Sequence, residues 1–148
     1  MTRIKLLFFL LAGLLASPGL LASGHEESPA GLLAIITSES NDTQAMALIL
    51  TTHYARGGRD VRVLLCDHAG GLAVSDSDMG STVVQPADRS PRQLLQGIIE
   101  AGAVVEVCAI FLPGAGLEEA DLVGGVGVAR PPEIAGLMAS PDWRLFTF

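Results

Sequence analysis

Three short apolar runs constrain the fold of this chain more than any other feature of its sequence. They occupy residues 32–37 (LLAIIT), 61–66 (VRVLLC) and 104–110 (VVEVCAI). Each run has the length of a β-strand and is almost continuously apolar, whereas a strand with one solvated face alternates apolar and polar residues. Strands of this kind are typical of a parallel sheet covered on both faces, so the runs predict an α/β fold.

A segment with helical periodicity separates the first two runs. The spacing predicts a helix over residues 43–55, with residues 41–42 (ND) as candidate N-caps and two glycines directly after its end. Met46 and Ile49 of this helix are interpreted as core residues because they are apolar. Strand, helix and strand within about 35 residues form a βαβ unit, whose crossover is right-handed.

The unit recurs along the rest of the chain. Residues 70–87 form a long segment that is a candidate functional loop, and Ser90 and Gln93 have the spacing of a capping box at the start of a helix that ends near Glu100. The remaining expected elements are a turn at residues 113–116, a helical turn at 117–122, a strand at 126–129, a helix at 133–138 and a strand at 144–148. We therefore expect a three-layer α/β/α sandwich around an open, mostly parallel five-stranded sheet, formed by residues 32–148.

The N-terminal residues 1–24 are expected to be a cleaved signal peptide. Arg3 and Lys5 precede an apolar stretch, a Pro-Gly pair interrupts it, and cleavage is expected within the small residues Ala22–Gly24. An uncleaved membrane anchor is the alternative, but a span needs about 20 apolar residues and this stretch is shorter. We expect export to the periplasm, with residues 25–31 as a linker and no membrane attachment after cleavage.

The charge of the chain excludes some classes of partner. It carries 9 basic and 16 acidic residues, and removing Arg3 and Lys5 leaves seven arginines and no lysine. Nucleic acids and anionic membrane surfaces need an electropositive face. We therefore expect neither as a partner.

Several segments resemble one known family. GAVVEVC, the glycine-rich turn after it, GLEEADLVGGVGV and the terminal hydrophobic strand look like the second half of DsrE/DsrF-like sulfur-relay proteins. The helix QAMALILTTHYARGG, the strand VRVLLCDHAG and the long loop resemble the first half. The resemblance implies the five-stranded α/β/α sandwich, assembly as a homo-oligomer, and a cysteine that carries sulfur as a persulfide.

Cys108 matches the cysteine of this family. Exported relatives often carry a C-x-x-C pair here, whereas this chain reads Cys108-Ala109-Ile110-Phe111. The resemblance therefore implies a sulfurtransferase-like carrier with one motif cysteine, which would exchange sulfane sulfur with a donor or acceptor protein or with a small thiol. Two alternatives stay open: a non-catalytic module that binds a small ligand or a partner, and a Cys108 that is simply a buried core residue.

Other candidate site residues lie at the same edge of the expected sheet. In open α/β sheets, ligands bind beyond the carboxyl ends of the strands, where Cys108 and Cys66 both lie. His68 follows Cys66 and is a candidate base or ligand. Gly114 and Gly116 belong to the turn after Cys108, where backbone N–H groups could stabilise a thiolate or persulfide anion.

A disulfide between Cys66 and Cys108 is disfavoured by the strand order that we expect. In a doubly wound sheet the first strand lies between the second and the third, which separates the two cysteines by about 9.6 Å, twice the strand spacing. Disulfides need Cα atoms within about 7 Å. Cys66 is then a resolving thiol or a buried cysteine.

We expect neither a cofactor nor a metal. The sequence lacks the spacings H-x-x-x-H and C-x-x-C that typically hold a metal ion. The glycine run at residues 124–127 has no P-loop lysine and does not join a strand to a helix. A flavodoxin-like cofactor site is disfavoured because no phosphate-binding loop follows the first apolar run.

Overall fold

The computed structural model describes residues 31–148. The predicted signal peptide at residues 1–24 lies outside the described residues, as does the predicted linker except for Gly31. The strand expected from Leu32 begins one residue earlier, at Gly31. Within residues 31–148, no helix is both long enough and apolar enough to span a membrane.

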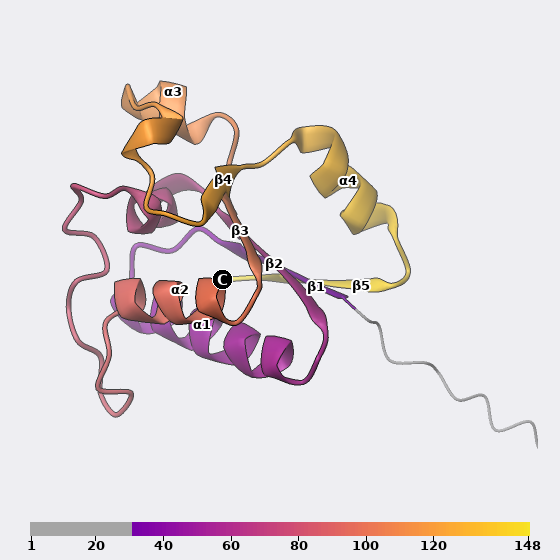
Figure 1. Cartoon of the computed structure of the whole chain (residues 1–148), viewed down its shortest axis with the longest axis horizontal. Coiled ribbons are helices and arrows are strands. Elements are labelled where there is room, and N and C mark those ends of the chain that lie inside the picture. Colours follow the sequence, from indigo (N-terminus) through magenta and orange to yellow (C-terminus); the bar gives the residue numbers. More distant parts are fainter. Residues whose placement is uncertain (1–30) are drawn as a thin grey trace, which may run out of the picture.

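Five strands form one open sheet in which every neighbouring pair is parallel (Figure 1). The strands are β1 (Gly31–Ile36), β2 (Asp60–Leu65), β3 (Val104–Val107), β4 (Val126–Val128) and β5 (Trp143–Thr147). Their order across the sheet is β4-β3-β2-β1-β5. The expectation of a five-stranded, mostly parallel sheet is confirmed.

Helices cover both faces of this sheet. Two of them, α1 (Asn41–Arg56) and α2 (Pro91–Glu100), lie side by side on one face, and α4 (Pro131–Ala139) covers part of the other (Figure 1). The short helix α3 (Phe111–Ala115) and the two 3₁₀ turns η1 (Asp67–Ala73) and η2 (Glu119–Asp121) complete the described elements. The three-layer α/β/α sandwich is confirmed.

The expected position of β1 between β2 and β3 is wrong, because β2 pairs directly with β3. Right-handed crossovers explain the difference. Since α1 and α2 cover the same face, the chain moves in one direction from β1 through β3. It reverses only at α4, which crosses the opposite face and places β5 beside β1.

The helix starts follow local capping rules. Ser90 and Gln93 form the predicted capping box, in which each side chain bonds to the backbone of the other residue. At α1 the N-cap is Ser40, whose hydroxyl accepts the N–H of Thr43, so the prediction of residues 41–42 as N-caps is wrong. An extended Ser40 with an oxygen aimed at the first turn satisfies one of the free N–H groups there.

The main core lies between the sheet and the α1–α2 layer. It contains the fully buried strand residues Val63, Leu65, Val105 and Val107 and the helix residues Leu48, Leu95 and Ile98. Met46 is 54% exposed, so its interpretation as a core residue is wrong. The face of α1 that is buried consists of Gln44, Ala45, Ala47, Leu48 and Thr51.

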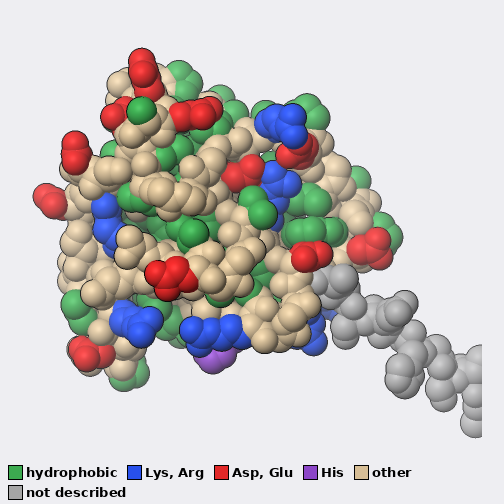
Figure 2. Space-filling view, in the orientation of Figure 1, with side chains coloured by type: hydrophobic (Ala, Val, Ile, Leu, Met, Phe, Trp, Pro, Cys, Tyr) green, Lys and Arg blue, Asp and Glu red, His purple; other side chains and the backbone are tan. Residues whose placement is uncertain are grey.

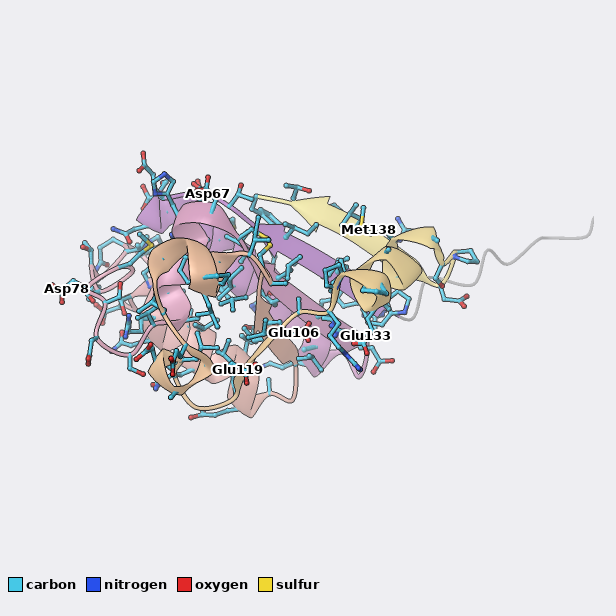
Figure 3. All side chains as sticks on the ribbon, turned by 90° about the horizontal axis from the view of Figure 1, so that it is seen from above. Asp67, Asp78, Glu106, Glu119, Glu133 and Met138 are labelled. Atoms are coloured by element: carbon cyan, nitrogen blue, oxygen red, sulfur yellow. A yellow bond between two sulfur atoms is a disulfide. The ribbon has the colours of Figure 1, made fainter. Side chains whose placement is uncertain are left out.

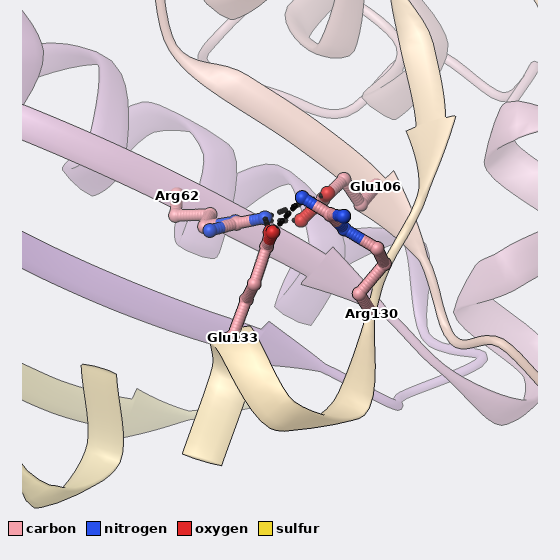
Figure 4. A network of polar contacts seen from close by, with 4 residues as sticks. All are labelled: Arg62, Glu106, Arg130 and Glu133. Carbon is pink, nitrogen blue, oxygen red and sulfur yellow. Dashed lines mark hydrogen bonds and ion pairs between the residues drawn. The ribbon is translucent and has the colours of Figure 1, made fainter. Parts of the chain in front are cut away.

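A network of charged side chains joins α4 to its face of the sheet (Figure 4). Arg62 of β2 donates two hydrogen bonds to the buried carboxylate of Glu106 on β3, at 2.6 and 2.8 Å. Arg62 also pairs with Glu133 in the first turn of α4, at 3.1 Å, and Glu133 pairs with Arg130. The hydrogen bond to Glu106 raises the pKa of Arg62 above its usual value, although burial opposes this shift.

Replacing Glu106 with glutamine tests how much this network contributes to the free energy of unfolding. Glu106→Gln keeps the size of the side chain but leaves the half-buried Arg62 without its bidentate partner, so we expect a loss of about 2–3 kcal/mol in the free energy of unfolding. Glu133→Gln is the matched control, because that carboxylate is 37% exposed and should contribute under about 1 kcal/mol. Urea denaturation measures both, and equal losses would contradict the assignment.

Candidate functional site

The candidate site lies at the carboxyl ends of β2 and β3, where the two cysteines of the chain face each other. Cys66 and Cys108 form a disulfide, with their Cα atoms 5.2 Å apart. Leu64 of β2 is opposite Glu106 of β3, so continuing this register by two residues places Cys66 opposite Cys108. The sequence interpretation that disfavoured the disulfide is wrong because it rested on the wrong strand order.

A pocket of about 650 Å³ opens beside the disulfide, and we call it the rim pocket. It is lined by Cys66, Asp67, His68, Gly71, Met79, Cys108, Ile110, Phe111, Gly114 and Ala115. Four of the five residues singled out in the sequence therefore come together here. The fifth, Gly116, ends α3 in a left-handed conformation and does not line the pocket.

Two adjacent glycines shape the floor of the rim pocket. Gly70 and Gly71 lie in η1, and the ring of Phe111 packs on the first while Met79 packs on the second. A Cβ atom at Gly70 would lie 2.5 Å from the Phe111 ring, and one at Gly71 would lie 2.9 Å from the sulfur of Met79. The backbone of η1 must therefore stay bare for these two side chains to line the pocket.

Asp67 turns the chain sharply beside the disulfide. Its φ of 50° is in the left-handed region, which aspartate tolerates better than most residues. This conformation leads the chain from β2 into η1 immediately after Cys66. The exposed Asp67 lies at the carboxyl end of the sheet, away from Glu133 and α4 (Figure 3).

The rim pocket is not electropositive. Its lining residues include no arginine or lysine, and Asp67 contributes a carboxylate. Arg92 approaches the floor, but its guanidinium donates to the carbonyl groups of Val74, Ser75 and Gly71. Acidic side chains also gather over the segment at residues 118–121, which follows α3 (Figure 2). This setting favours neutral or cationic ligands over anions.

The backbone around α3 offers less to an anion than the sequence suggested. The N–H groups of Phe111, Gly114 and Gly116 donate to the carbonyl groups of Cys108, Ile110 and Pro113, at 2.9, 3.1 and 3.4 Å. These N–H groups are already paired. They are therefore not free to stabilise a thiolate or persulfide.

A second, smaller pocket meets Cys108 from the α4 face of the sheet, and we call it the α4-side pocket. Its volume is about 220 Å³, and it is lined by Leu64, Cys108, Ala109, Ala129, Pro131, Ile134, Ala135 and Met138. Every lining residue is apolar. Cys108 lines both pockets, whereas Cys66 lines only the rim pocket.

Several site residues were missed in the sequence. Asp67, Met79 and Phe111 line the rim pocket. The strand expected to reach residue 110 ends at Val107, and the helix α3 forms where only a turn was expected. The Gly-Gly pair after His68 was the available signal, because adjacent glycines often mark a close approach of other groups to the backbone. In the described part of the chain, no three His, Cys, Asp or Glu side chains are grouped so as to hold a metal ion.

Adding a methyl group at Gly70, beneath the Phe111 ring, should destabilise the fold. In Gly70→Ala the new methyl group collides with the Phe111 ring, and we expect a loss of about 1–3 kcal/mol in the free energy of unfolding. The control is Gly97→Ala in α2, where a Cβ meets no atom within 4 Å and the helix should gain about 0.5–1 kcal/mol. Urea denaturation with the disulfide intact compares them, and a Gly70→Ala protein of wild-type stability would refute the packing described.

Comparison with known proteins locates the fold but not the activity. No protein-family model matches the chain, and no curated protein matches its sequence.

Solved structures do match. The ychN protein of E. coli is 18% identical with a TM-score of 0.63, and the alignment covers 82% of this chain and 99% of ychN. MTH1491 of Methanobacterium thermoautotrophicum, a protein of unknown function, is 14% identical with a TM-score of 0.57, over 80% of this chain and 97% of its own. BT1422 of Bacteroides thetaiotaomicron, also of unknown function, is 14% identical with a TM-score of 0.54, over 80% and 95%. At these identities the likeness establishes the fold alone, an α/β/α sandwich that this chain shares with ychN.

Proposed function

We propose that this protein is a periplasmic sulfur-relay component that carries sulfane sulfur as a persulfide on Cys108. The observation that carries the proposal is the pairing of Cys108 with Cys66 beside the rim pocket. The disulfide lies at the carboxyl ends of β2 and β3, where a reagent in the rim pocket can reach its two sulfur atoms. The DsrE/DsrF-like fold is compatible with such a role.

The proposed transfer starts from the reduced protein. The Cys108 thiolate attacks the outer sulfur of a donor persulfide R–S–SH, forms a new S–S bond, and releases R–S⁻. An acceptor thiolate then attacks the outer sulfur of the Cys108 persulfide and leaves Cys108 as a thiolate. No net oxidation occurs, because one sulfane sulfur moves from donor to acceptor.

Cys66 limits the lifetime of this persulfide. With the two Cα atoms 5.2 Å apart, the Cys66 thiolate can attack the inner sulfur of the Cys108 persulfide. That attack forms the Cys66–Cys108 disulfide and expels hydrosulfide. The disulfide is then the state that remains after an unclaimed sulfur has been released.

The surroundings of the disulfide narrow the choice of donor and acceptor. Without a cation in its lining, the rim pocket suits a neutral small thiol or the cysteine of a partner protein better than an anionic thiol. The basic and apolar residues at the N-terminus support export to the periplasm, where protein disulfides persist. Assembly as a homo-oligomer is proposed on the family resemblance.

A second function is favoured by the composition of the rim pocket. Met79, Ile110, Phe111 and Ala115 give it a largely apolar lining of the kind that holds small organic ligands. The protein would then be a non-catalytic binding module, with the disulfide as a structural link between β2 and β3.

Sulfur addition to the reduced protein separates the two functions. The purified protein is reduced, freed of reductant, incubated with inorganic polysulfide, and examined by intact mass. We expect one added sulfur in the wild type, a longer-lived addition in Cys66→Ser because no thiol resolves it, and none in Cys108→Ser.

Two outcomes count against the carrier. An addition that persists in Cys108→Ser moves the site to another residue. No addition in either the wild type or Cys66→Ser leaves the binding module as the better account.

A further inference from the structure

The two pockets at the Cys66–Cys108 disulfide differ in the cysteines that they reach: Cys108 lines both, and Cys66 lines the rim pocket. A nucleophile that opens a disulfide approaches the attacked sulfur from the side opposite the leaving sulfur. The two cysteines follow adjacent strands, so the line from Cys66 through Cys108 points toward β4, and the reverse line points toward β1. Space beside β4 would permit attack on Cys108, and space beside β1 would permit attack on Cys66.

The α4-side pocket provides that space beside Cys108. Ala129 follows β4 and donates its N–H to the carbonyl group of Val107 at 2.9 Å, which places it next to Cys108 in the sheet. Ala129 lines the α4-side pocket, and its small side chain leaves the approach open. Neither pocket at the disulfide is lined by a residue of β1 or of residues 37–40 after it.

The lining of this pocket restricts what can enter. All eight residues around it are apolar, and its volume is about 220 Å³. A charged group in this pocket would have no polar or charged side chain to pair with. The apolar lining therefore disfavours glutathione and similar charged thiols, whereas hydrogen sulfide can enter as a small neutral molecule.

We propose that the oxidised protein accepts hydrogen sulfide through the α4-side pocket and converts it to a persulfide on Cys108. The proposal rests on the proposed function, because it makes the same Cys108 persulfide, but it names a different substrate and a different starting state. No separate sulfane donor is needed.

The disulfide itself is the oxidant in this step. The sulfide sulfur loses one proton to solvent and attacks the Cys108 sulfur, the bond to Cys66 breaks, and Cys66 leaves as a thiolate that takes up a proton. Hydrogen sulfide and the disulfide thus give one persulfide and one thiol. The two electrons lost by the sulfide sulfur are gained by the disulfide.

Cys66 is suited to be the leaving group. Cys66 lines the rim pocket but not the α4-side pocket, and the exposed polar side chains of Asp67 and His68 lie beside it. A thiolate released there is protonated from solvent, because the Asp67 carboxylate disfavours a second anion beside it. The outer sulfur of the new persulfide lies in the α4-side pocket, and rotation of the Cys108 side chain brings it to the rim pocket, which Cys108 also lines.

Substitutions that fill the α4-side pocket test the route. Ala135 is exposed on α4 and lines the pocket, so Ala135→Phe should fold normally, and Ala129→Val narrows the pocket from the β4 side. The oxidised full chain is incubated with sodium sulfide, alkylated, and examined by intact mass and peptide mapping. We expect the wild type to gain one hydrogen sulfide, with the persulfide on Cys108 and the new thiol on Cys66.

Both pocket variants should react about tenfold or more slowly than the wild type, because in-line access to the attacked sulfur is lost. The matched control is Ala139→Phe, which adds the same ring at an exposed position of α4 outside the pocket lining and should leave the rate within about twofold. Wild-type rates in both pocket variants, a persulfide on Cys66, or no reaction with sulfide would each overturn the proposal.

The reaction of the reduced protein with polysulfide is measured in parallel, and its result separates the two proposals. Sulfur addition there without any reaction of the oxidised protein with sulfide rejects this inference alone. Reaction of the oxidised protein with sulfide, without addition to the reduced protein, rejects sulfane transfer and keeps the sulfide step. Absence of both reactions rejects both.

Discussion

Direct pairing of β2 with β3 is the constraint on which the site depends. The two strands are parallel and in a register that carries Cys66 and Cys108 to opposite positions just beyond their ends. Because residues opposite each other in a sheet project from the same face, both sulfur atoms lie on the α4 side. The same face carries Glu106, two residues before Cys108, and Arg62, four residues before Cys66, which pair diagonally across the two strands. One pairing thus positions both the disulfide and the ion pair that supports the sheet beneath it.

The unequal covering of the two faces explains why the disulfide can be reached. The long helices α1 and α2 seal one face with a continuous apolar core. On the other face α4 has only nine residues, and the charged network and a small apolar cluster around Leu33, Leu64 and Ile134 hold it to the sheet. The α4-side pocket lies under this short helix, and the rim pocket lies under α3 and η1. Cys108 is the residue that the two pockets share.

Local patterns in the sequence were sufficient to predict most helices and strands. They were not sufficient to predict the order of the strands in the sheet. The apolar runs predicted β1, β2 and β3, and the spacing of Ser90 and Gln93 predicted the start of α2. Strand order depends on which face each helix covers, and both possible orders obey the right-handed crossover rule. A usable signal was present: Arg62 and Glu106 are opposite charges in two otherwise apolar strands, and each lies an even number of residues before a cysteine. Such charges are stable in a core when they pair, which requires neighbouring strands.

The central claim is that Cys66 and Cys108 lie on adjacent strands and are joined within one chain. Mapping the cysteine pairing tests it most directly: the oxidised protein is alkylated without reductant, digested, and examined for linked peptides by mass spectrometry. We expect one intramolecular peptide pair joining Cys66 to Cys108, with neither cysteine alkylated until reductant is added. Two alkylated cysteines in the oxidised protein, or links between chains only, would contradict it.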